Sequence, residues 1–350
     1  MSTSPTIPNA AASPQKSPSP ERSGAGERDP HRGRRLTLLI LSRYGTLIGL
    51  ALMVVLFTVR APEAFFNITN FVNILSQSSL TAIIAAGLTM TLVVGEFDLS
   101  IGYAASFAGL LVVGFIALNG LPVAAAVLLM LMIGAAVGTA NGVLVTKVRI
   151  NAVIATLGVG TILTGLGFAY SAFPIAAGIP QSFDNISLGR PLLGIPNPII
   201  IMVLVLAILW FILNKTDLGQ KMQAVGGNIE AARLSGIRVD RVKIFAFGAA
   251  GVCAALTGIL LSALLGSGTL AAADGYLLDA FAAVFLGSAT LRDGEFHIVG
   301  TFVGVLIISV GFNGLSIFGA PSWAQDVFNG GILIVAVGLS TLSRRYAKAG

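Results

Sequence analysis

Charged residues are scarce in this chain of 350 residues. Lys, Arg, Asp and Glu make up 10% of it, whereas a soluble domain has about 25%, and 55% of the residues are hydrophobic. The mean hydropathy is +0.90, and the long apolar stretches exclude a soluble enzyme, a nucleic-acid-binding protein and a disordered chain. We therefore expect a membrane protein embedded in a lipid bilayer, whose basic residues mark its cytoplasmic loops.

Cysteine and histidine are almost absent. The single cysteine, Cys253, lies in an apolar run, which excludes a disulfide framework and a clustered thiol metal site. One of the two histidines, His297, lies beside Glu295, and no span carries a relay of acids or histidines, which argues against an ion- or proton-coupled carrier. The chain also lacks the Gly-x-x-x-x-Gly-Lys-Ser/Thr phosphate loop, so we expect no ATPase site, no cofactor and no metal.

The first 35 residues differ from the rest of the chain. They are rich in Ser, Pro, Gly and charge, and cannot bury enough apolar surface to fold, so we expect a disordered cytoplasmic arm. Residues 36–343 are predicted to form an all-α polytopic membrane domain, and 344–350 a cytoplasmic tail. The glycine-rich runs 134–142 and 300–314 resemble each other weakly, as internal repeats do in many transporters.

A membrane-spanning helix needs about 20 mostly apolar residues. We expect about ten transmembrane or re-entrant helices, at 37–59, 71–94, 101–119, 121–145, 150–170, 196–213, 244–266, 277–291, 298–318 and 327–342. The stretch 277–291 is short, which favours a half-helix or a re-entrant segment. The boundary at 119–122 is only a tight turn.

Basic residues indicate the orientation in the membrane. If both termini are cytoplasmic and all segments cross, only Arg60 and Arg190 of the 21 basic residues lie outside. The positive-inside rule favours such an asymmetry. The segments 171–195 and 267–276 are then extracytoplasmic. Eight crossings satisfy the same test if two segments are re-entrant.

A polar segment interrupts the apolar runs at 95–102. It contains Glu96, Asp98, Ser100 and Gly102. Acids at membrane depth tend to face a cavity or a partner, which suits a helix break or gate on the transport path. The preceding span is already full length, however, so spacing alone favours a short cytoplasmic turn in which Asp98 and Ser100 cap the next helix.

The longest polar stretch inside the membrane region is 214–243. We expect a loop, a short helix and a second loop, with Asn228 as the N-cap of the helix 229–234 and Gly236 just past its end. The small residues of the helix leave a shallow face that a partner protein can bury, and a solvated basic loop is the competing interpretation. The residues expected to receive the partner are Gly227, Asn228, Glu230, Ala231, Ala232 and Gly236.

Polar side chains on otherwise apolar spans are candidates for the transport path. An interhelical hydrogen bond, worth about 0.6 kcal/mol, is the favoured explanation for any single one of them, and we expect only two or three to face the path. The candidates are Asn73, Gln77, Asn141, Thr156, Thr164 and Asn313.

Four segments of the chain, in this order, resemble the permease subunit of the ribose/xylose/galactose type of bacterial ABC sugar importer. They are 87–102, 138–158, 224–237 and 285–314. The first is similar to that family's GG-x-DLS-x-G pattern, with Glu96 in place of a glycine. The third contains the Glu-Ala-Ala-x-x-x-Gly pattern of the loop that receives the ATPase, and the resemblance covers roughly residues 40–345.

The resemblance implies a multi-pass permease subunit of the bacterial plasma membrane that translocates a monosaccharide or a related polyol. It also implies three partners. An ABC ATPase subunit binds the ATP and docks at 214–243, an extracytoplasmic solute-binding protein delivers the sugar, and a second permease copy completes the path. A self-sufficient secondary carrier or channel for a small polar solute is the alternative, and the segment 230–236 argues for the importer.

Overall fold

The computed structural model describes residues 32–288 and 294–349. The chain divides into two units, residues 1–38 and 39–350. Of the first unit, the described part is the beginning of helix α1 (Arg32–Arg60). The predicted disordered arm therefore lies outside the described residues, except that its last residues, 32–35, already belong to α1.

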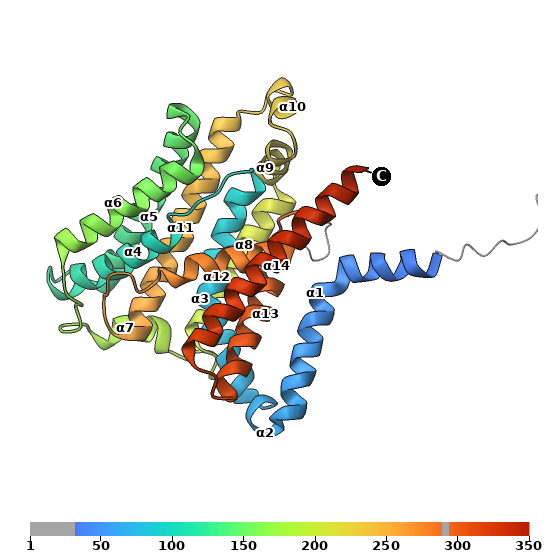
Figure 1. Ribbon diagram of the computed structural model, residues 1–350. Coiled ribbons are helices and arrows are strands. Elements are labelled where there is room, and N and C mark those ends of the chain that lie inside the picture. The colour runs from blue at the N-terminus through green and yellow to red at the C-terminus, as the bar shows by residue number, and fades with distance from the viewer. Residues whose placement is uncertain (1–31, 289–293, 350) are drawn as a thin grey trace, which may run out of the picture. The chain divides into compact units, whose positions relative to one another are not determined.

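The second unit is helical (Figure 1), which confirms the predicted all-α class. Its described residues form no strand, only two isolated bridges, Ile175 with Gly268 and Leu192 with Ile195. After α1 the elements are α2 (Pro62–Phe65), α3 (Ile68–Val93), α4 (Ile101–Ala117), α5 (Val123–Val143), the π-helical turn η1 (Leu144–Val148), α6 (Ala152–Tyr170), α7 (Gln181–Leu188), α8 (Asn197–Lys215), α9 (Asp217–Gly227), α10 (Ile229–Leu234), α11 (Val239–Leu265), α12 (Gly275–Ser288), α13 (Ile298–Ile317) and α14 (Ser322–Ala349).

Six of the described helices are long and apolar enough to cross a membrane: α3, α5 with η1, α6, α8, α11 and α13. The other predicted spans correspond to α1, α4, α12 and α14. Helix α12 has 14 residues and is a half-helix in length, as expected, although 289–291 of the predicted segment lie outside the described residues. Helix α14 has 28 residues, so the predicted span 327–342 is too short at both ends.

The connections between the spans are partly as expected. The tight turn at 119–122 is confirmed, because α4 ends at Ala117, α5 begins at Val123, and Gly120 takes a positive φ of 67°. The segment 171–195, for which only an extracytoplasmic location was predicted, contains α7, whose Ser187 donates a hydrogen bond to the carbonyl oxygen of Leu260 at 2.6 Å. Helix α7 is thereby fixed near the C-terminal end of α11.

Glycines allow the helices to approach closely, as the small residues predicted. A β-carbon on Gly134 of α5 would overlap the backbone of Gly251 on α11, and one on Gly251 would overlap Gly134. Gly287 of α12 and Gly300 of α13 face each other in the same way. Side chains at these positions would push the helices apart, so the bundle depends on glycine there.

The helix contacts repeat between two halves of the unit, α3–α6 and α11–α14. Helix α11 packs on α4 and α5, just as α3 packs on α12 and α13, and α4 contacts α6 as α12 contacts α14. Helices α3 and α11 also pack on each other and join the halves. The glycine-rich runs 134–142 and 300–314 lie on the corresponding helices α5 and α13, which is the arrangement of a structural repeat.

Candidate functional site

The polar stretch 214–243 is mostly helical, so the expected arrangement of loop, helix and loop is wrong. Helix α8 continues to Lys215, and α9 follows almost at once. Thr216 caps α9, because its Oγ1 accepts a hydrogen bond from the Gly219 N–H at 3.2 Å. Helix α11 begins at Val239, which is about one and a half turns before the span predicted from residue 244.

Both ends of α10 are as the sequence predicted. The Oδ1 atom of Asn228 accepts a hydrogen bond from the Ala231 N–H at 3.0 Å, which makes Asn228 the N-cap. Gly236 lies just past the C-terminal end of the helix with a φ of 79°, in the left-handed region that favours glycine. A side chain at Gly236 would meet no atom within 4 Å, so this position is open to solvent or to a partner.

The exposed face of α10 differs from the predicted one. Ala232 is only 3% exposed and packs into the protein, so its assignment to a docking face is wrong. The Glu230 side chain is 79% exposed and forms an ion pair with Arg233 at 3.6 Å, and Leu234 is 90% exposed. We call the exposed residues Glu230, Ala231, Arg233 and Leu234 the α10 surface. An apolar side chain flanked by charges suits a protein contact.

Helix α9 rests directly on the end of α3. A β-carbon on Gly226 would overlap the carbonyl oxygen of Val93, the last residue of α3. The neighbouring Gly227 faces open space. Met222 and Val225 are also buried, so α9 packs on the bundle along one face. At position 226, where α9 contacts Val93, only glycine fits.

The chain leaves the helical conformation at 94–100, between α3 and α4. Gly95 has a φ of 81°, and Asp98 is 1% exposed. The Oδ1 atom of Asp98 accepts hydrogen bonds from the N–H of Ser100 at 2.9 Å and from its hydroxyl at 2.6 Å. Burial raises the pKa of Asp98 to about 6, although these hydrogen bonds act in the opposite direction. The predicted capping by Ser100 is wrong, because its side chain makes no capping bond to α4.

Two of the predicted path residues hold this break in place. Asn141 of α5 donates from Nδ2 to the Ser100 hydroxyl oxygen at 2.8 Å, and Thr156 of α6 accepts from the Leu99 N–H at 3.1 Å. Both side chains are fully buried. We call the segment 94–100 with Asn141 and Thr156 the polar break. It ties α3, α4, α5 and α6 together by hydrogen bonds inside an apolar bundle.

The polar break also contacts the other half of the bundle. A β-carbon on Gly102 would lie 3.3 Å from the carbonyl oxygens of Ala273 and Asp274, which precede α12. Phe97 stacks on Phe281 of α12, with ring centroids 6.1 Å apart. The break therefore lies where the two halves meet.

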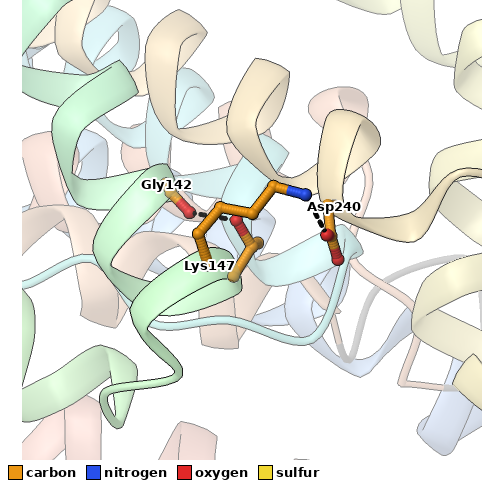
Figure 2. Close-up of polar contacts among 4 residues, drawn as sticks. Gly142, Lys147 and Asp240 are labelled. Carbon is orange, nitrogen blue, oxygen red and sulfur yellow. Dashed lines mark hydrogen bonds and ion pairs between the residues drawn. The ribbon is translucent and has the colours of Figure 1, made fainter.

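Two ion pairs connect the first turns of α11 to the elements around the break. Lys243 of α11 pairs with Glu96 at 2.5 Å, and the two side chains are only 11% and 18% exposed. Figure 2 shows the second pair, in which Lys147 of η1 reaches Asp240 at 2.6 Å. Glu96, which stands where the GG-x-DLS-x-G pattern has a glycine, thus has Lys243 as its ion-pair partner.

The remaining path candidates separate into two groups. Asn313 of α13 exchanges two hydrogen bonds with Asn70 of α3, at 2.8 and 3.1 Å, and Thr164 donates to the carbonyl oxygen of Gly160 on its own helix. These are internal bonds. Asn73 and Gln77 lie one turn apart on α3 and are exposed, and neither side chain has a hydrogen-bond partner among the described residues.

Sequence reasoning missed several residues of the site. Lys243 and Leu234 were not singled out, and neither was Asp279 of α12, whose Oδ1 accepts a hydrogen bond from Asn329 of α14 at 2.5 Å. An acid inside an apolar predicted span was the available signal for Asp279. In the described part of the chain, no group of three or more His, Cys, Asp or Glu side chains is placed to hold a metal ion.

Comparisons with known proteins show the family of this chain. A family model described as "Branched-chain amino acid transport system / permease component" matches residues 70–337. The ribose import permease protein RbsC of Escherichia coli (strain K12) is 38% identical over 312 residues, which cover 87% of this chain and 96% of RbsC. The RbsC protein of Bacillus subtilis (strain 168) is also 38% identical, over 299 residues that cover 85% of this chain and 92% of that protein.

A relative that is named for a different sugar is also similar along most of its length. The D-allose transport system permease protein AlsC of Escherichia coli (strain K12) is 33% identical over 304 residues, which cover 87% of this chain and 93% of AlsC. No solved structure gives a significant match. With a family model that covers most of the chain and relatives that match it almost end to end, the chain belongs to the family of branched-chain amino acid transport system permease components.

Proposed function

We propose that this chain is the membrane-spanning permease subunit of an ABC importer for a monosaccharide or a related polyol. The similarity to ribose and allose permeases supports the substrate class. The chain is a multi-pass membrane protein, and we place it in the bacterial plasma membrane. Its ATP is hydrolysed by a separate ATPase subunit, an extracytoplasmic binding protein delivers the sugar, and a second permease copy completes the path.

In this proposal α9 and α10 are cytoplasmic, and so are both termini. The distribution of basic residues supports this orientation, because only Arg60 and Arg190 of the 21 Lys and Arg residues then lie outside. Helices α7 and α10 lie at opposite ends of the bundle (Figure 1), and they lie near the C-terminal and N-terminal ends of α11 respectively. Helix α7 is then extracytoplasmic.

Cysteine labelling tests this topology. Ser182 on α7 and Ser235 after α10 are both exposed, and the single natural cysteine, Cys253, is buried. An impermeant thiol reagent added outside intact cells is expected to label Ser182→Cys and not Ser235→Cys. Permeabilised cells are the control, because both variants should react there. Labelling of Ser235→Cys alone from outside would reverse the proposed topology.

The coupling mechanism follows from how α9 and α10 are attached. The α10 surface is free to bind a partner. On one side of it, α9 contacts the end of α3 at Gly226. On the other side, the chain enters α11, whose Lys243 forms the ion pair with Glu96. The proposed mechanism rests on this one observation: α9 and α10 are connected to the helices on both sides of the polar break. An ATPase that moves α9 and α10 therefore moves α3 and α11, the helices that join the two halves.

Leu234 has the largest exposed apolar area of the α10 surface, so replacing it tests whether the ATPase docks there. We expect Leu234→Asp to lose co-purification of the ATPase and sugar-stimulated ATP hydrolysis, because a charge replaces an anchor that is buried in the complex. The amount of membrane-inserted permease should not change, since Leu234 is 90% exposed in the free chain. Leu188→Asp is the matched control, because Leu188 ends α7, outside the segment 214–243, and is 52% exposed. Normal ATPase binding by Leu234→Asp would remove the docking assignment.

Asn73 and Gln77 are the path candidates that we retain. Their amides point out of the subunit and can bind sugar hydroxyls, whereas Asn141, Thr156 and Asn313 are committed to internal hydrogen bonds. We expect Asn73→Leu and Gln77→Leu each to lower sugar uptake per inserted molecule at unchanged folded yield. Asn313→Leu should instead lower the folded yield, because it leaves the Oδ1 atom of Asn70 without its hydrogen-bond donor. Unchanged uptake in the Asn73 and Gln77 variants would reject this path.

The substrate class is tested with the reconstituted permease, ATPase and binding protein against a panel of monosaccharides. We expect stimulation of ATP hydrolysis by a pentose or hexose and none by branched-chain amino acids, the class in the family description. Stimulation by leucine alone would contradict the proposed substrate class without affecting the assignment as a permease.

A further inference from the structure

A groove of about 640 Å³ lies on the side of the subunit between α5, α8 and α11. Its walls are mostly apolar, and small residues are among those that line it: Ala135 of α5, and Gly248 and Ala249 of α11. Val205 and Ile208 of α8 form the third wall. A sugar in this groove would leave its hydroxyl groups without partners, so the groove does not belong to the transport path.

The groove has the length of a fatty acyl chain. Along α11 it extends from Arg241 to Leu256, which corresponds to about 22 Å at 1.5 Å per residue. One leaflet of the hydrocarbon core is about 15 Å thick, half of a core of about 30 Å, so the groove spans a leaflet and reaches its headgroup region. The open side of the groove includes the exposed residues Ile208 and Phe245, which a lipid can contact.

One end of the groove carries a positive charge without a counter-charge. Arg241 lines the groove and is exposed, and its guanidinium has no ion-pair or side-chain hydrogen-bond partner among the described residues. The adjacent Asp240 does not neutralise it, because Asp240 pairs with Lys147 at 2.6 Å (Figure 2). A basic residue at the headgroup end of an apolar groove between helices is complementary to an anionic phospholipid.

We propose that this groove is a binding site for an anionic phospholipid, with one acyl chain along α11 and the headgroup phosphate on Arg241. In the topology proposed above, this lipid belongs to the cytoplasmic leaflet. Arg241 lies in the first turn of α11, between Asp240 and Lys243, which hold α11 to η1 and to the polar break. The lipid therefore steadies the turn through which α10 is connected to the bundle.

Native mass spectrometry of the purified full-length chain, equilibrated with equal amounts of phosphatidylglycerol and phosphatidylcholine of the same acyl chains, tests the site. We expect the chain to retain phosphatidylglycerol about fivefold over phosphatidylcholine, the preference that one basic residue near an anionic headgroup supplies. Arg241→Gln should reduce this ratio to about one, and Arg241→Lys should keep most of it. Arg238→Gln is the matched control, because Arg238 is exposed and does not line the groove.

A variant that fills the groove separates the lipid from other occupants. A β-carbon on Gly248 would meet only the Thr139 Oγ1 at 3.3 Å and the Ala135 carbonyl oxygen at 4.0 Å, so Gly248→Leu points into the groove. We expect it to lose the retained lipid at unchanged oligomeric mass. Equal retention of both lipids by the unmodified chain, or a preference that survives Arg241→Gln, would overturn the proposal. A changed oligomeric mass in Gly248→Leu with lipid retention intact would assign the groove to a second copy of the chain.

Discussion

Replacing Gly226 by alanine is expected to abolish the coupling between ATP hydrolysis and sugar uptake. The added β-carbon would overlap the carbonyl oxygen of Val93, so α9 must move away from the end of α3. Forced shifts of this kind cost about 1–3 kcal/mol in well-packed proteins. Uptake per membrane-inserted molecule should fall at least tenfold, and ATP hydrolysis should lose its stimulation by the sugar-loaded binding protein.

The next residue provides the matched control. Gly227 is also a glycine in the last turn of α9, but its β position faces open space. Gly227→Ala leaves the contact of α9 with α3 unchanged, so it should insert normally and lose far less uptake than Gly226→Ala. Equal uptake by Gly226→Ala and Gly227→Ala would show that the contact of α9 with α3 does not carry the coupling.

The ion pair between Glu96 and Lys243 is expected to show a strong double-mutant coupling. Both side chains are nearly buried, so removing one charge leaves the other without compensation, at a cost of about 3–5 kcal/mol. Glu96→Gln and Lys243→Met should each lower the temperature of unfolding markedly in detergent. The double variant should recover most of this loss, because neither charge then remains buried.

The pair Lys147–Asp240 is the control for the same experiment. It links the same region of α11 to a neighbouring element, but its side chains are 60% and 37% exposed. Pairs that are exposed to solvent contribute about 0–1 kcal/mol, so Lys147→Met should change the unfolding temperature little. If the losses of the two Glu96 and Lys243 single variants simply add in the double variant, the two residues do not act as a pair.

Local signals in the sequence predicted local structure well. Asn228 and Gly236 delimit α10 because capping depends on the side chain and backbone of single residues. The same chemistry at Thr216 begins α9, and the pattern of Thr216 followed by Asp217 was the available signal for that helix. Six of the ten predicted spans correspond to described helices that are long and apolar enough to cross a bilayer, because length and hydropathy are also local properties of the sequence.

Contacts between distant segments were not predictable in this way. Ser100 was assigned to the helix break, and an interhelical hydrogen bond was the favoured explanation for Asn141 and for Thr156. The sequence did not say with which residues they bond, and the fold brings all three to one buried polar break. Ala232 was placed on the docking face by its size, but the packing of α10 buries it. The direction in which a residue of a short helix points depends on what the helix packs against, and the sequence of the helix does not contain that information.

Uptake of a radiolabelled monosaccharide into proteoliposomes tests the central claim most directly. The vesicles contain this chain alone, or this chain with its ATPase, and the binding protein and ATP are supplied on their proper sides. We predict accumulation against the concentration gradient only with the ATPase, ATP and the binding protein present together, and loss of accumulation in the Leu234→Asp variant. Accumulation by the chain alone, driven by an ion or proton gradient, would contradict the proposed importer and establish a self-sufficient carrier.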